Sequence, residues 1–72
     1  MKVPSKVLRQ FAKRVREMRL AKGISQEKLG SLAGVHRTYV GMIERAEKNI
    51  TLANIEKFAK ALGVRLRELV DF

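Results

Sequence analysis

The sequence contains no cysteine and no tryptophan, and it has one proline and one histidine among its 72 residues. Without cysteine the chain can form neither a disulfide nor a thiolate metal site, and one histidine alone does not make a metal centre. No apolar run approaches the roughly 20 residues of a membrane-spanning helix, and no segment resembles a secretion signal. We therefore expect a cytoplasmic protein without metal, cofactor or small-molecule ligand, stabilised by one small apolar core.

Acidic residues are also scarce. Seven Asp and Glu stand against sixteen Lys and Arg, which gives a formal net charge of +9. Most of this surplus lies in residues 1–36, which hold nine basic and two acidic side chains, against seven and five in residues 37–72. Such a balance predicts a polyanionic partner and binding that weakens with salt. The charge alone does not identify the polyanion, and a merely soluble basic protein is the alternative.

Apolar residues recur at the three- and four-residue spacings of amphipathic helices. We expect helices over about 6–22, 26–33, 37–45 and 52–62, followed by a short helix or turn, with residues 1–4 as a lead-in. No segment shows strand-like alternation, so the predicted fold is a single all-α, five-helix domain over residues 1–72 with its core in 6–70. The predicted core stripes are Leu8, Phe11, Ala12, Val15 and Met18; Leu29, Ala33, Val35, Val40 and Ile43; and Leu52, Ile55, Phe58, Ala59 and Leu62.

Residues 26–45 are typical of two short helices joined by a tight turn at Gly34. The second helix has an outward face, formed by Arg37, Thr38, Gly41 and Met42, that no core requires. A helix presented in this way by a basic chain is typical of a helix-turn-helix unit that inserts its second helix into the DNA major groove. The sequence therefore predicts sequence-specific binding of double-stranded DNA.

We expect the four outward residues to read bases. Arg37 can donate two hydrogen bonds to guanine, and Thr38 offers a hydroxyl and a methyl group. Gly41 costs about 1 kcal/mol relative to alanine in a helix, which indicates close approach to the groove wall; relief of crowding against a neighbouring helix is the alternative. Met42 either touches thymine methyl groups or covers the edge of the core.

Four segments carry a resemblance to a known family: Val15–Arg19, Gly23–Leu29, Ile43–Arg45 and Ala61–Val64. Over Arg16–Leu69 the chain resembles the Xre/Cro-like helix-turn-helix regulators of phages and bacteria. Residues 36–40 and 49–51 make it most similar to controller proteins of restriction–modification systems, except that His36 stands where those proteins have an acidic cap. The resemblance implies a transcription regulator rather than an enzyme.

The resemblance also implies particular contacts. Gln26 matches the glutamine that binds a DNA phosphate in this family, and Arg19 and Glu44 match a partly buried ion pair that joins the first helix to the recognition helix. We expect the DNA backbone to be contacted by Ser25, Gln26, His36, Tyr39, Arg45, Lys48 and Asn49. Ordinary solvation of the basic loop, and packing of Tyr39, are the alternatives.

The end of the chain is more apolar than a monomer requires. We expect Leu66, Leu69, Val70 and Phe72 to form a homodimer interface that serves a (pseudo)palindromic operator, with core filling as the alternative for Leu66 and Leu69. No nucleophile–histidine–acid set or phosphate-binding glycine loop indicates an enzyme. An antitoxin-type or phage-type repressor that also binds a protein partner stays open, as does membrane-surface binding by the basic first helix.

Overall fold

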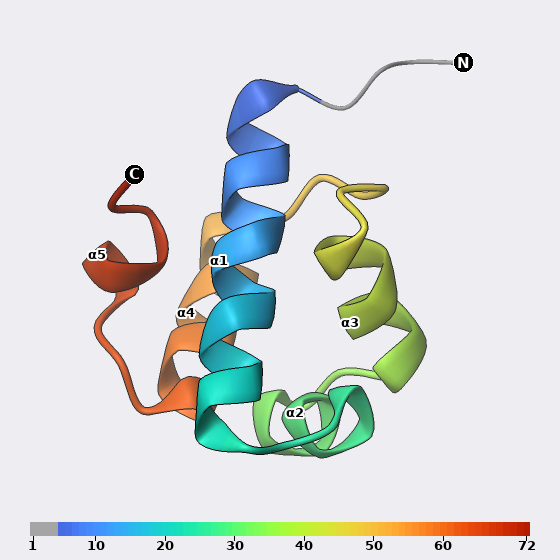
Figure 1. Cartoon of the computed structure of the whole chain (residues 1–72). Helices are drawn as coiled ribbons and strands as arrows, with labels where there is room; N and C mark the ends of the chain where they lie inside the picture. Colours follow the sequence, from blue (N-terminus) through green and yellow to red (C-terminus); the bar gives the residue numbers. More distant parts are fainter. Residues whose placement is uncertain (1–4) are drawn as a thin grey trace.

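The computed structural model describes residues 5–72, and these residues form five helices and no strand (Figure 1). Residues 1–4, predicted as a lead-in, lie outside the described residues. The all-α prediction is confirmed, and the predicted helix bounds agree with the structure to within a residue or two. The helices are α1 (Lys6–Lys22), α2 (Gln26–Ala33), α3 (Arg37–Glu44), α4 (Leu52–Leu62) and α5 (Leu66–Leu69).

Local hydrogen bonds fix where the helices begin. The hydroxyl oxygens of Ser5, Ser25 and Thr51 each accept a hydrogen bond from a backbone N–H three residues later, at 3.2, 2.9 and 3.1 Å. Such caps satisfy one of the free N–H groups at a helix start. The sequence therefore specifies the boundaries of α1, α2 and α4 locally, before any tertiary packing.

The turn between α2 and α3 depends on two glycines. Gly34 adopts the left-handed conformation, with φ of 73°, and ends α2. Gly30 is buried, and a Cβ atom there would lie only 2.7 Å from the carbonyl oxygen of Val35. The small residue at position 30 thus lets the chain that leads into α3 run directly against α2, which sets the close approach of the two helices.

One core joins all five helices. Its innermost side chains, each no more than 2% exposed, are Val15, Leu29, Val40, Ile43, Phe58 and Leu69. Leu52 is the exception in the predicted stripe: it is 70% exposed, whereas Asn54 and Ile55 of the same turn are half buried. The core otherwise follows the predicted periodicity, with Leu8, Met18, Val35 and Ile55 only partly buried at its edges.

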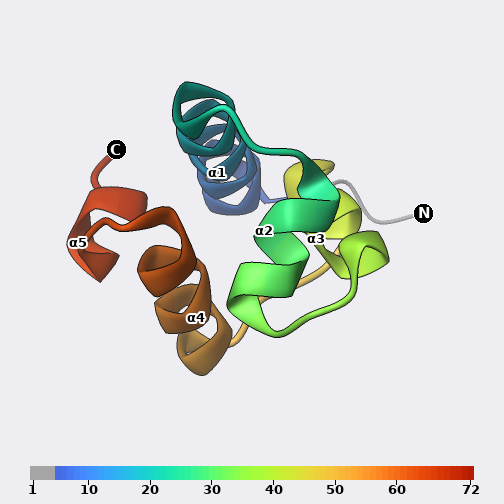
Figure 2. The same cartoon turned by 90° about the horizontal axis from the view of Figure 1, so that it is seen from below.

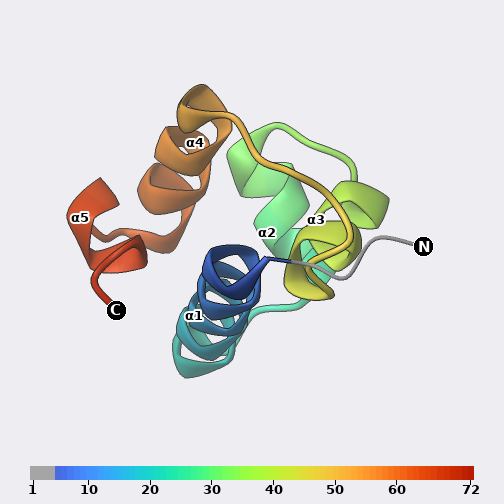
Figure 3. The same ribbon diagram turned by 90° about the horizontal axis from the view of Figure 1, so that it is seen from above.

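Helices α3 and α5 lie far from each other in the fold (Figure 1). Seen along the three views, α3 lies on one side of the molecule and α5 on the other, with α1 and α4 between them (Figures 1, 2 and 3). A surface built on α3 therefore cannot include α5 of the same chain.

Candidate nucleic-acid interface

The start of α3 is the exposed part of the helix-turn-helix unit. Arg37 and Thr38 are both exposed, whereas Val40 and Ile43 are buried against the core. Viewed from below, α2 lies across α3 and leaves the outer side of α3 uncovered by any other helix (Figure 2). Two of the four predicted base-reading residues thus stand on an uncovered helix end.

His36 caps this helix. Its Nδ1 atom accepts a hydrogen bond of 3.0 Å from the backbone N–H of Thr38. An imidazole that accepts at Nδ1 and is neutral carries its proton on Nε2, where it can still donate to another group. Histidine thus caps α3 at the position where the resemblance implied an acidic residue. The predicted contact of His36 with a DNA phosphate stays a prediction.

A buried ion pair ties α1 to the end of α3. Arg19 donates from Nε and Nη2 to the two carboxylate oxygens of Glu44, at 2.7 and 3.0 Å, and from Nη1 to the carbonyl oxygen of Ile24 at 2.9 Å. The side chains are only 10% and 3% exposed. Hydrogen bonding to Glu44 raises the pKa of the Arg19 guanidinium above its ordinary value, against the smaller opposing effect of burial. The structure therefore has the pair that the resemblance implied.

Gln26 belongs to the same network. Its Nε2 atom donates to Oε1 of Glu44 at 3.1 Å, which holds the half-buried amide at the start of α2, beside α3. Glu44 thus accepts from both Arg19 and Gln26, and no polar side-chain atom that is buried in residues 5–72 lacks a partner. The network positions the amide predicted to meet a phosphate.

Gly41 is not on the outward face as predicted. It is buried, because the side chain of Arg45 folds back along α3 and the side chain of Gln26 approaches from α2. A Cβ atom at position 41 would lie 2.9 Å from Nη1 of Arg45 and 3.4 Å from Oε1 of Gln26. Its absence leaves room for these two side chains, and the predicted approach of Gly41 to a base stays a prediction. Met42 is half buried.

Two exposed ion pairs flank α3. Nη1 of Arg37 lies 2.8 Å from Oε2 of Glu27, and Nε of Arg45 lies 3.0 Å from Oε2 of Glu47. The hydrogen bond between Arg45 and Glu47 raises the pKa of the guanidinium and lowers the pKa of the carboxyl. Lys48 and Asn49 are exposed in the connection that follows. Sequence reasoning did not find either pair, since nothing in residue spacing shows where long charged side chains will point.

Sequence reasoning also missed the role of Asn54. Its Nδ2 atom donates to the hydroxyl oxygen of Tyr39 at 3.0 Å, and the ring of Tyr39 packs edge-on against Phe58 with centroids 6.2 Å apart. The hydroxyl therefore accepts within the protein and keeps its own hydrogen for an outside acceptor. An asparagine one turn into a helix carries no sequence signal for this role.

The four predicted interface residues lie in three different places. Leu69 is fully buried in the core, so its prediction as an interface residue is wrong, and core filling accounts for it. Leu66 is half buried and borders a shallow apolar surface with Leu52, Ala53 and Glu56, which we call the α4 patch. Val70 and Phe72 are 42% and 49% exposed and line a separate hollow of about 300 Å³.

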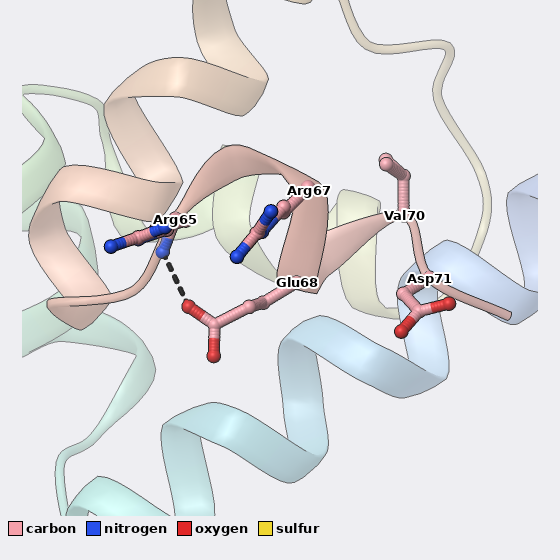
Figure 4. Close-up of a pocket in the computed structure, with 5 residues that line it drawn as sticks. All are labelled: Arg65, Arg67, Glu68, Val70 and Asp71. Carbon is pink, nitrogen blue, oxygen red and sulfur yellow. Dashed lines mark hydrogen bonds between the residues drawn. The ribbon is translucent and has the colours of Figure 1, made fainter.

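The outer side of α5 is polar rather than apolar. Arg65, Arg67, Glu68 and Asp71 line an open hollow of about 710 Å³ together with Val70 (Figure 4). The carboxylate of Glu68 accepts a 2.7 Å hydrogen bond from the backbone N–H of Arg65 and so closes the start of α5 within its own chain. This side of the short helix is thus a charged surface.

The residues that the structure describes contain no cluster of His, Asp and Glu side chains placed to hold a metal ion. None of the helices in residues 5–72 is long and apolar enough to cross a membrane.

The chain is similar to known proteins over most of its length. Residues 15–69 match the helix-turn-helix family HTH_3. Control protein C.BamHI of Bacillus amyloliquefaciens is 51% identical over 63 residues, which is 86% of this chain and 78% of that protein. Control protein C.SmaI of Serratia marcescens is 42% identical over 60 residues, which is 83% of this chain and 71% of that protein.

Solved structures agree with this match. The restriction–modification controller protein C.AhdI of Aeromonas hydrophila superposes with a TM-score of 0.85 at 52% identity, covering 86% of this chain and 94% of that one. The controller protein C.Esp1396I superposes with a TM-score of 0.86 at 31% identity, covering 93% and 90%. This chain therefore belongs to the helix-turn-helix family of DNA-binding transcription regulators, and it is close to the controller proteins of restriction–modification systems.

Proposed function

We propose that this protein binds a (pseudo)palindromic operator as a homodimer, with α3 in the major groove, and controls a restriction–modification operon. The observation that carries the proposal is the uncovered start of α3, where Arg37 and Thr38 are exposed while the opposite side of the helix is buried. Recognition helices of this type contact base edges mainly through their first residues. The similarity to control proteins supports the operon assignment. Regulators of this family are not enzymes.

The base-reading chemistry belongs to the side chains that reach the groove. Arg37 presents a guanidinium that matches the two acceptors of guanine, and the methyl group of Thr38 suits thymine. Met42, one turn later and half exposed, is placed for a second apolar contact. Arg45, which lies along α3 over Gly41, adds a positive charge to the same face.

The remaining contacts position the backbone of DNA. Ser25 and Gln26 stand at the start of α2, where free N–H groups and the helix dipole favour a phosphate. The hydroxyl of Tyr39 can donate to a phosphate oxygen because Asn54 already supplies its internal bond. The remaining proposed backbone contacts are His36, which precedes α3, and Lys48 and Asn49, which follow it.

We propose that the α4 patch is the homodimer interface. Leu52 is the most exposed of the large apolar side chains in residues 5–72, and Leu66 adjoins it. Since α3 and α4 pack into the same core, a two-fold axis beside α4 would hold two copies of α3 in a fixed relation. A separation of about 34 Å would match half-sites one helical turn apart. Val70 and Phe72 define the competing interface.

Leu52→Asp is expected to abolish the dimer without unfolding the protein, because this side chain is 70% exposed and its burial would occur only between copies. Sedimentation equilibrium at tens of micromolar is the measurement, with Val70→Asp as the matched variant. A monomeric Val70→Asp protein beside a dimeric Leu52→Asp protein would place the interface at the C-terminal hollow instead. A monomeric wild type that also binds DNA as a monomer would contradict the homodimer.

Gly41→Ala is expected to separate stability from binding. The replacement favours the helix by about 1 kcal/mol, but the new Cβ atom displaces the guanidinium of Arg45. We therefore expect a higher thermal midpoint together with operator binding weakened about fivefold. In an Arg45→Ala background the same replacement should affect binding less, because only the side chain of Gln26 then lies against the new methyl group. Unchanged operator affinity in Gly41→Ala would show that the position of Arg45 is irrelevant to DNA.

The direct test of function is selection of DNA from a random-sequence duplex pool, followed by a footprint. We expect one enriched sequence with two related half-sites, and affinity that falls steeply with salt, as counterion release requires. The enriched sequence should occur upstream of the protein's own gene, beside genes for a methyltransferase and an endonuclease. Recovery of no preferred sequence would contradict the proposed function.

A further inference from the structure

Two exposed glutamates hold the two arginines that the proposed function assigns to the DNA surface. Glu27 lies in the first turn of α2 and pairs with Arg37 at 2.8 Å. Glu47 lies just beyond the end of α3 and pairs with Arg45 at 3.0 Å. The four side chains are between 51% and 72% exposed. Both pairs therefore stand in solvent, on the elements expected to face DNA.

Stability of the fold does not account for these pairs. Exposed ion pairs contribute little, because water and salt screen them and because two flexible side chains must be ordered. The pair between Arg19 and Glu44, in contrast, is buried and connects two helices. The positive end of α2 favours an acidic residue near position 27, but it does not require that residue to bind Arg37, and Glu47 lies outside any helix.

A carboxylate on a DNA-binding surface has a direct cost, since it repels the phosphates. It also occupies a donor. The N–H group of Arg37 that donates to Glu27 cannot at the same time make a full hydrogen bond to a base or phosphate. A contact of DNA with that same N–H group therefore has to exchange one acceptor for the other, whereas the remaining N–H groups of the guanidinium stay available.

We propose that Glu27 and Glu47 compete with DNA for Arg37 and Arg45 and thereby lower the affinity for non-operator sequences; this inference rests on the proposed function. On an arbitrary sequence, the arginine exchanges its carboxylate for a single phosphate contact, which gains little. At the operator, Arg37 exchanges it for the paired acceptors of guanine, which hold a guanidinium better than one oxygen does. Both glutamates thus weaken binding to every sequence, and Glu27, whose arginine is proposed to read a base, weakens it most where no matching base is present.

The experiment compares glutamine variants on two probes: a duplex selected by the wild-type protein from a random pool, and a duplex of the same composition in scrambled order. The variants are E27Q, E47Q and their combination, with E17Q as the matched control. Glu17 is exposed on α1, so its replacement removes the same charge without touching either pair. Fluorescence anisotropy over a salt series gives the affinity and its salt dependence for each variant.

We expect the double variant to bind the scrambled duplex roughly three- to tenfold more tightly than wild type does. The gain in binding free energy should exceed twice the gain seen in E17Q, because the double variant removes two charges and E17Q removes one. The ratio of operator to scrambled affinity should fall in E27Q and in the double variant, and should stay near the wild-type ratio in E47Q alone. The slope of log K against log salt on the scrambled duplex should become steeper by about one for each arginine that gains a phosphate. Thermal midpoints should not move.

A second comparison tests whether the effect of E47Q on DNA affinity depends on Arg45. In an Arg45→Gln background, E47Q should change scrambled-duplex affinity no more than E17Q does. Equal effects of E27Q, E47Q and E17Q in the wild-type background would overturn the inference while leaving operator binding intact. A wild-type protein that binds both duplexes equally would instead overturn the proposed function.

Discussion

Glu44→Ala is expected to lower the free energy of unfolding by about 3–5 kcal/mol, the usual cost of leaving one member of a buried ion pair without its partner. Arg19 would keep its bond to Ile24 but lose two charge-assisted hydrogen bonds, and Gln26 would lose its acceptor. A domain of this size has a total stability of the same order. Denaturation with urea, followed by circular dichroism at 222 nm, measures the loss.

The matched control is Glu47→Ala, which breaks an exposed pair and should leave the denaturation midpoint nearly unchanged. Glu44→Gln retains an acceptor for one hydrogen bond and should fall between the two. DNA binding by Glu44→Ala should decline with the folded fraction, because the pair holds the recognition helix to α1. A Glu44→Ala protein with wild-type stability and lost DNA binding would show that Glu44 acts on DNA and not on the fold.

Arg37→Ala is expected to weaken operator binding roughly 5- to 150-fold, which corresponds to the 1–3 kcal/mol carried by a paired contact to guanine. Its thermal midpoint should match the wild type, since the Arg37 side chain is 64% exposed and its ion pair with Glu27 lies in solvent. Anisotropy titrations with the selected operator and with each single base-pair variant of it provide the measurement. The loss should concentrate at one base pair of each half-site.

Two controls separate base reading from charge. Arg16→Ala removes one positive charge from an exposed position on α1 and should weaken all duplexes slightly and equally. Arg37→Lys keeps the charge but not the planar pair of donors, so it should lose most of the discrimination. If Arg37→Ala weakens the operator and every variant duplex to the same extent, then Arg37 contacts a phosphate and reads no base.

The elements of the fold could be predicted because their signals are local. Ser25 and Thr51 cap their own helices, and the spacing of Val15, Val40 and Phe58 follows one helix at a time. The ends of the core could not be predicted in the same way. Leu52 is exposed and Leu69 is buried. Their burial depends on which elements from elsewhere in the chain pack beside them, and the spacing of apolar residues does not show this.

The candidate site likewise has a part that the sequence predicts and a part that depends on tertiary packing. The exposure of Arg37 and Thr38 follows from the amphipathic pattern of one short helix. That pattern does not predict three contacts of the site. These are the packing of Arg45 over Gly41, the hydrogen bond from Asn54 to Tyr39 and the ion pair of Glu27 with Arg37. Each of these three contacts forms only after the helices have packed. Each also involves a side chain that can adopt several rotamers.

The buried Glu44 and the exposed Arg37 also define how such a protein can change over time. Arg37 and Thr38, two of the residues proposed to read bases, are exposed and take no part in the core, so most substitutions at positions 37 and 38 should cost little folding stability. Mutation at position 44 should lower that stability at once. If the proposed base contacts hold, a scaffold arranged in this way can change its preferred DNA sequence by single substitutions while every intermediate sequence still folds.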